Sequence, residues 1–275
     1  MRVTTVSGMK TSLQHLIGAG ALLSSEEDAA VRSFNRFGKL AWDRARWPFN
    51  CVLKQIIPDV RVRSVNVGSG GSGYVSGAPT VTVAGSATAT ATLNSDDEVN
   101  GIAVTAAGSG YTEAPAVTIA APPSGTTATA TATIIAVIDM GTTMDTVFRI
   151  TTTDPYTTVT KALGFRIDAE AGASDYGLAV IENHSSTAPL WVHYRTPFNT
   201  YGGSATDYPD IFSEYAVQGA YSNWLQSDGQ TSKAQAALQE AEAILATELD
   251  RLERQQGQQD DVLINTYGTT APQPA

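Results

Sequence analysis

A chain of 275 residues with a formal net charge of −10 has room for one large domain or for two to three small ones. Its 17 Lys and Arg residues against 27 Asp and Glu residues argue against a general nucleic-acid binder, although DNA can slide along an acidic channel wall. The single Cys51 excludes an intrachain disulfide, and no apolar run approaches the roughly 18 residues that cross a bilayer, so we expect a soluble protein without membrane contact.

The first long element is a predicted helix that begins at Ser24 and ends before Pro48. Ser24 and Glu27 fit a capping box, and apolar residues follow at helical spacing. The opposite face carries a basic stripe: Arg32, Arg36, Lys39 and Arg46. This stripe is either a solvated face or a contact with an acidic partner or DNA. Because the chain's negative charge repels a duplex, we favour a neighbouring subunit or another protein over DNA.

Residues 60–138 contain the same sequence pattern twice. Residues 62–67 and 71–74 return as 99–104 and 108–111, at an offset of 37 residues. Each copy then enters an alternation of Ala with Thr, which predicts short antiparallel strands because the side-chain period of a strand is two. The repeated positions carry no acid, base or metal ligand. The pattern therefore predicts an inserted β module, with a thin core around Tyr74 and Tyr111, that acts as a structural surface.

The remaining chain falls into a β region, a helical segment and a polar tail. Four strands are predicted between residues 139 and 207, over 147–150, 164–167, 177–181 and 190–194. One helix is predicted to start at Tyr208-Pro209-Asp210, and a second at Ser232 that runs to about Gln256. The predicted domains are 1–59 (N-terminal helical segment), 60–138 (repeat module), 139–207 (β region), 208–256 (C-terminal helical segment) and 257–275 (docking tail).

No pattern in the sequence indicates catalysis or cofactor binding. His15, His184 and His193 lack a second ligand at the spacing of a zinc site. The sequence has no nucleophile elbow, Walker loop or evident Ser-His-acid set. We therefore expect a non-enzymatic protein with no cofactor and no metal.

Several motifs together resemble the head-to-tail adaptor, or neck, proteins of tailed bacteriophages. The resemblance covers roughly residues 25–47 and 139–256, and its motifs are helix-packing patterns. They are Ser-Phe-Asn-Arg (33–36), Leu-Ala-Trp (40–42), Arg-Trp-Pro (46–48), Pro-Leu-Trp-Val-His-Tyr-Arg (189–195), Tyr-Pro-Asp-Ile-Phe (208–212), Asp-Gly-Gln-Thr-Ser-Lys-Ala (228–234) and Leu-Asp-Arg-Leu-Glu-Arg-Gln-Gln (249–256). The repeat module departs from a minimal adaptor as an insertion.

The resemblance implies an α+β fold with a helical adaptor core, made of N-terminal helices and two C-terminal helices, together with a β domain and the inserted module. It implies a ring of twelve copies in the virion neck, assembled in the bacterial cytoplasm, that joins the portal to a tail or nozzle protein. The ring would continue the DNA channel and touch DNA non-specifically during ejection. The residues expected to contact the portal or a neighbouring subunit are Arg32, Arg36, Lys39, Arg46, Leu245, Leu249, Leu252 and Arg254.

A second hypothesis rests on the repeat module alone. A tandem β unit of this kind is also compatible with a capsid or fibre decoration protein, or with a carbohydrate-binding protein. The two hypotheses differ in assembly, since only a connector is expected to form a ring and to associate with a portal.

Overall fold

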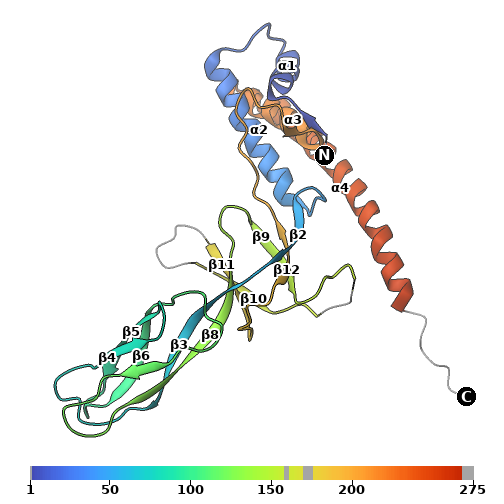
Figure 1. Ribbon diagram of the computed structural model, residues 1–275. Coiled ribbons are helices and arrows are strands. Elements are labelled where there is room, and N and C mark those ends of the chain that lie inside the picture. Colours follow the sequence, from blue (N-terminus) through green and yellow to red (C-terminus); the bar gives the residue numbers. More distant parts are fainter. Residues whose placement is uncertain (1, 158–160, 170–175, 268–275) are drawn as a thin grey trace, which may run out of the picture. The chain divides into compact units, whose positions relative to one another are not determined.

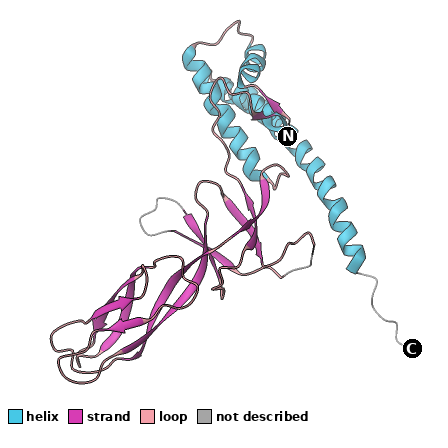
Figure 2. Ribbon diagram, viewed as in Figure 1, coloured by secondary structure: helices cyan, strands magenta, loops and turns pink. Residues whose placement is uncertain are grey.

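The computed structural model describes residues 2–157, 161–169 and 176–267, except for the side chains of 169, 176 and 256–267. The described residues form four helices and thirteen strands (Figures 1 and 2). The chain divides into two compact units. The helical unit comprises residues 1–51 and 198–275, and the β unit comprises residues 52–197.

The expected fold class, an α+β protein built on a helical adaptor core, is wrong. The described residues are mainly β, with thirteen strands in four antiparallel sheets and only four helices. The fold differs from the expectation because the first and last strands of the repeat module are long and join a sheet outside it. Strands β3 (Asp59–Ser69) and β8 (Thr129–Asp139) are continuous over eleven residues each, and they share a sheet with β10 (Phe165–Ala169) and β11 (Tyr176–Ile181). The strands therefore form the larger unit.

The helical unit contains α1 (Val6–Ile17), α2 (Ser24–Arg44), α3 (Asp210–Ser227) and α4 (Thr231–Tyr267), with a short pairing of β1 (Val3–Thr4) with β13 (Tyr208–Pro209). The predicted start of the helix at Ser24 is confirmed, but its capping residues are shifted by one position. The Glu26 carboxylate accepts a hydrogen bond from the Leu23 N–H at 2.7 Å. Glu27 instead pairs with Lys10 of α1, at 2.7 Å. None of the described helices is long and apolar enough to span a membrane.

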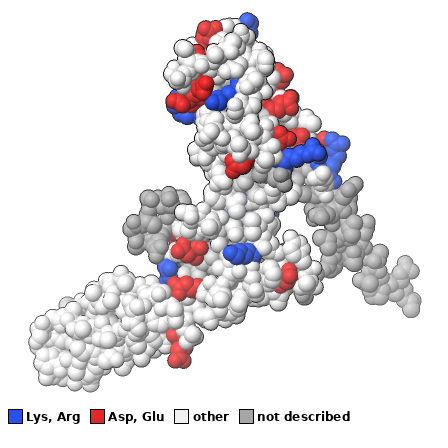
Figure 3. All heavy atoms as spheres, turned by 45° about the horizontal axis from the view of Figure 1, so that its top comes forward, with Lys and Arg blue, Asp and Glu red and all other residues white. Residues whose placement is uncertain are grey.

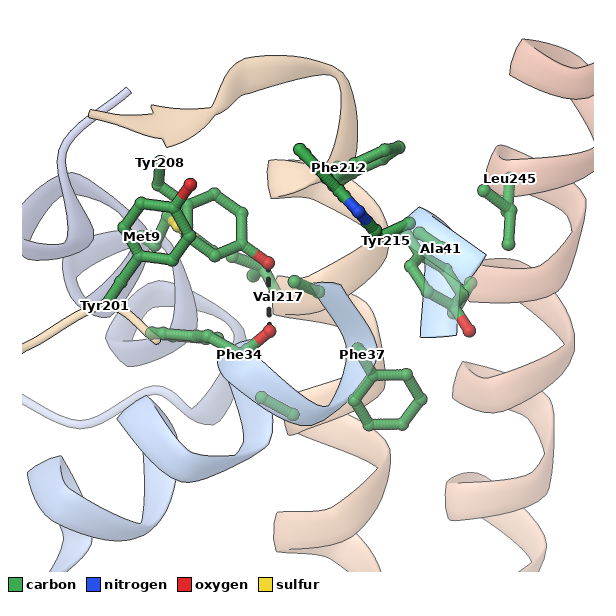
Figure 4. Close-up of a cluster of buried hydrophobic side chains, with 14 of the residues drawn as sticks. Met9, Phe34, Phe37, Ala41, Tyr201, Tyr208, Phe212, Tyr215, Val217 and Leu245 are labelled. Carbon is green, nitrogen blue, oxygen red and sulfur yellow. Dashed lines mark hydrogen bonds between the residues drawn. The ribbon is translucent and has the colours of Figure 1, made fainter. Parts of the chain in front are cut away.

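Aromatic side chains fill the core of the helical unit (Figure 4). The Tyr208 hydroxyl donates a hydrogen bond to the Phe34 carbonyl at 2.9 Å. The Phe37 ring meets Tyr215 edge-on, with centroids 5.4 Å apart. Phe212 is fully buried, and its ring lies 5.1 Å from that of Trp47. Dense packing of this kind fixes the relative positions of α2, α3 and α4.

The described residues of the β unit form three sheets. The four strands predicted after residue 139 are confirmed, as β9 (Thr146–Thr151), β10, β11 and β12 (Leu190–Arg195). Beside the sheet ordered β10-β11-β8-β3, a second sheet runs β2-β12-β9, where β2 is Cys51–Ile56. The third sheet lies in the repeat module and has the order β6-β5-β4-β7, with bounds β4 Thr80–Val83, β5 Thr88–Leu93, β6 Val99–Ala106 and β7 Val117–Ile119.

The two sequence copies exchange strands. The first copy supplies β3, β4 and β5, and the second copy supplies β6, β7 and β8. The first strand of each copy pairs with the last strand of the other, β3 with β8 and β6 with β5. The registers are equivalent, since Val65 lies opposite Ala132 just as Ile102 lies opposite Ala91. Both ladders are also interrupted at equivalent positions.

An internal two-fold relation passes through the centre of the module. Strands β4 and β7, which are equivalent in the two copies, pair antiparallel with Thr82 opposite Thr118. Two further backbone hydrogen bonds also form an equivalent pair, Val62 N–H to the Ala107 carbonyl and Val99 N–H to the Gly70 carbonyl, both 2.9 Å. The two copies together therefore resemble a closed dimer, joined into one chain.

Each repeated tyrosine holds the other copy in place. The Tyr74 hydroxyl accepts a hydrogen bond from the Ala128 N–H, and the Tyr111 hydroxyl accepts one from the Ala87 N–H, both at 2.8 Å. The Tyr74 ring lies in a small apolar cluster built from both copies, and the Tyr111 ring lies in the larger core that the module shares with the rest of the β unit. Neither copy has a complete set of backbone partners alone, so the two copies fold as one unit.

Candidate partner-binding surfaces of the helical unit

Three of the four predicted basic residues lie on one exposed face of α2. Arg32, Arg36 and Lys39 are exposed there, and Lys39 pairs with Asp43 at 3.3 Å. Arg46 is also exposed, but it follows the end of the helix at Arg44. We call Arg32, Arg36 and Lys39, with the exposed Leu40 beside them, the basic face of α2.

The predicted residues of α4 have a different placement. Leu245 and Leu252 are buried in the core of their own unit, and Leu249 is half-buried against the same core. Arg254 is exposed and pairs with Asp250 one turn earlier. These three leucines therefore pack α4 against the rest of the helical unit and are not an exposed surface.

A groove of about 660 Å³ lies where α4 passes the first turns of α3. Its apolar lining comes from Trp47, Phe49, Ile211, Ile244 and Leu252, and its charged lining from Arg2, Asp210, Glu214, Glu248 and Arg251. We call this the α3–α4 groove. Sequence reasoning missed it, because its lining comes from four separate segments. The sequence signal nearest to it is Trp-Pro-Phe at 47–49, directly after the predicted helix.

Glu248 leaves a polar atom unsatisfied in this groove. Its Oε2 is buried and, within the described residues, has no hydrogen-bond partner. The Arg251 guanidinium lies 3.5 Å away, which is close enough for an ion pair but too long for a good hydrogen bond. A buried carboxylate oxygen of this kind is costly unless a donor reaches it.

Charge is unevenly distributed along the helical unit. Residues 31–46 contain five cationic residues and one anionic residue, a net charge of +4. Residues 210–255 contain eight anionic and three cationic residues, a net charge of −5. Figure 3 shows charged side chains over the helical unit, whereas the visible face of the repeat module is almost free of them. The helical unit thus carries the surfaces suited to electrostatic recognition.

The buried tyrosines of this unit have structural environments. Burial, followed by the nearby Glu242 carboxylate, raises the pKa of Tyr215 to about 12. Its hydroxyl donates to Glu242 Oε1 at 3.3 Å, and Glu242 also lies 3.4 Å from Arg44 of α2. Burial also raises the pKa of Tyr208. Both phenols stay protonated at neutral pH; Tyr215 links α3 to α4, and Tyr208 links β13 to α2.

A second depression, on the β unit, is lined mainly by polar residues. It measures about 710 Å³ and includes Arg63, Asn66, Asn183 and His184. The His184 Nε2 is buried and has no partner among the described residues. The described part of the chain contains no group of three or more His, Cys, Asp or Glu side chains placed to hold a metal ion. No family model, no curated protein and no solved structure matches this chain.

Proposed function

We propose that this protein is a non-enzymatic connector of a tailed-phage virion, whose copies form a ring between the portal and the tail. The observation that carries the proposal is the length of α4. This helix continues to Tyr267, whereas Leu252 is the last residue buried in the unit's core among those whose side chains are described, which end at Gln255. At 1.5 Å per residue, the helix extends about 22 Å beyond that point.

A helix end of this composition is expected to need a partner. Residues 255–259 read Gln-Gln-Gly-Gln-Gln, which offers little side-chain support for an isolated helix. Beyond them the sequence turns apolar at Val262, Leu263 and Ile264. A polar spacer followed by an apolar cluster suits docking of a terminal segment into a groove on another protein. We assign this docking to the portal.

Ring formation supplies the stability of the proposed assembly. Each subunit contributes a modest contact, and closure of the ring makes the contacts mutually reinforcing. The net charge of −10 is compatible with a channel that DNA traverses without sticking. The β unit, with its interlocked repeat module, is then the part that meets a tail or nozzle protein.

The polar depression around His184 favours a second candidate, a capsid or fibre decoration protein that binds carbohydrate. Planar polar side chains and an unsatisfied ring nitrogen suit a ligand rich in hydroxyl groups. This candidate predicts glycan binding by the isolated protein without any association with a portal.

The proposal is tested by co-purification with the portal protein of the phage that encodes this chain. The full-length chain is expected to bind the portal in several copies, and deletion of residues 257–275 is expected to weaken binding at least tenfold while the melting temperature stays unchanged. Equal binding by the truncated chain would place the docking segment elsewhere. Failure of the full-length chain to bind at any concentration would overturn the connector function.

A further inference from the structure

We infer that copies of this chain contact one another head to tail, with the basic face of α2 of one copy seated on the α3–α4 groove of the next. The inference rests on the proposed ring and names the surfaces that would form it. The two surfaces share no residue, so both are available on every copy at once. An interface between two different surfaces is heterologous, and repeating it generates a ring when the rotation closes.

Charge complementarity supports this pairing. Residues 31–46, which contain the basic face, have a net charge of +4, and the groove is lined by three carboxylates, Asp210, Glu214 and Glu248, against two arginines, Arg2 and Arg251. Asp210 and Glu214 are exposed at the groove, and Arg32 and Arg36 are exposed on α2. Charges of opposite sign on two surfaces accelerate encounter and help to fix the orientation of the partners.

The apolar parts of the two surfaces also match. Leu40 lies one turn after Arg36 on α2 and is 49% exposed, so it offers an apolar contact next to the basic side chains. Half-buried Phe49, Ile211 and Ile244 form the apolar lining of the groove. A central apolar anchor surrounded by charged contacts is the usual arrangement of a specific interface.

Glu248 adds a carboxylate that can accept from a cationic occupant. Its Oε2 lies 3.5 Å from the Arg251 guanidinium and has no hydrogen-bond partner within the described residues, so a guanidinium or ammonium group entering the groove would add a charged donor. Arg32, Arg36 and Lys39 are the groups that the inferred neighbour presents.

The test exchanges the charges of the two surfaces in the full-length chain. The face variant carries R32E and R36E, and the groove variant carries E214K and E248K. Native mass spectrometry at low salt is expected to show wild-type assemblies larger than dimers and only monomers for each variant alone. A mixture of the two variants is expected to regain assemblies larger than dimers, because the wild-type face meets the wild-type groove and the reversed face meets the reversed groove in alternation. The chain with all four changes is expected to regain assemblies larger than dimers.

Matched controls reverse charges on α4 outside the groove, K233E and E240K, at positions that are also exposed. Circular dichroism melting confirms that each variant is folded. Three results would each overturn the inference. They are assemblies of wild-type size in both variants, a mixture that remains monomeric, and a wild-type chain that never self-associates. Portal binding is scored separately, so loss of the head-to-tail contact is distinguishable from loss of the connector function.

Discussion

The helical unit and the repeat module achieve a defined structure by opposite means. The helical unit packs large aromatic rings, and Phe212 alone lies within 5.1 to 6.4 Å of the rings of Trp47, Phe49 and Trp42. The repeat module has few bulky residues, and between Arg63 and Arg149 the sequence contains no Lys or Arg. Its order comes from backbone pairing, from glycines in turns and from two tyrosines that cross between the copies.

The difference indicates that the helical unit and the repeat module have different roles. A unit with a dense core and a segregated charged surface is suited to specific contacts that can assemble and dissociate. A module whose strands are exchanged between two copies, and whose sequence has no Lys or Arg between residues 64 and 138, is suited to holding a fixed shape. Substitutions in the helical unit should therefore change the free energy of unfolding by a different amount, and for a different reason, than substitutions in the repeat module.

The largest effect is expected in the aromatic core. Truncation of Phe212 to Ala removes a fully buried ring and should lower the free energy of unfolding by about 3–5 kcal/mol, measured by denaturant titration. Leu238, which is 40% exposed on α4, serves as the control, and L238A should cost less than 1 kcal/mol. A cost for F212A as small as that of the control would contradict a core organised around this ring.

The second prediction contrasts two equivalent glycines of the module. Gly73 and Gly110 both have left-handed φ angles, +84° and +74°, so Ala is strained at either position by about 1–2 kcal/mol. A Cβ at Gly73 would collide with the Ser124 carbonyl, whereas a Cβ at Gly110 has no atom within 4 Å. G73A should therefore cost about 1–3 kcal/mol more than G110A. Equal unfolding free energies for the two variants would show that the turns are not packed as described.

The third prediction sharpens the internal two-fold relation. Y74F and Y111F each leave one buried backbone N–H without its acceptor, and each should cost about 1–3 kcal/mol. Because the two hydrogen bonds are equivalent in partner and length, the two costs should have the same sign and similar size. Y156F is the neutral control, since that ring is 86% exposed. A neutral effect at one of the two buried tyrosines would break the equivalence.

The smallest effect concerns pH. The pKa of Tyr215 is raised in the folded state, so its contribution to stability is fully present below pH 10, the ordinary pKa, and is lost as the pH rises toward about 12. Y215F lacks this titration. The difference in unfolding free energy between wild type and Y215F should thus shift in favour of Y215F between pH 10 and 12. A difference independent of pH across that range would be inconsistent with a buried phenol here.

Local patterns predicted single elements well. The helix from Ser24, the helix at Asp210 and the four strands after residue 139 follow from side-chain periodicity and turn residues. Strand pairing depends on residues far apart in the sequence, and the repeat leaves two equally plausible partners for each strand. Strands β5 and β8 have almost the same Ala/Thr pattern, so nothing in the sequence says whether β3 pairs with its own copy or with the other. The α3–α4 groove was missed for a similar reason, because its lining is brought together only by tertiary packing.

The most direct test of this account removes the repeat module and asks whether assembly survives. Val62 and Ile134 are opposite one another in the ladder of β3 and β8, so residues 63–133 can be replaced by an Asn-Gly hairpin turn while residues 59–62 keep their partners. Electron-microscopy class averages of this chain mixed with the portal should show a ring bound to the portal, as for the full-length chain. A folded, soluble chain that leaves the portal bare would place assembly in the module and contradict the account.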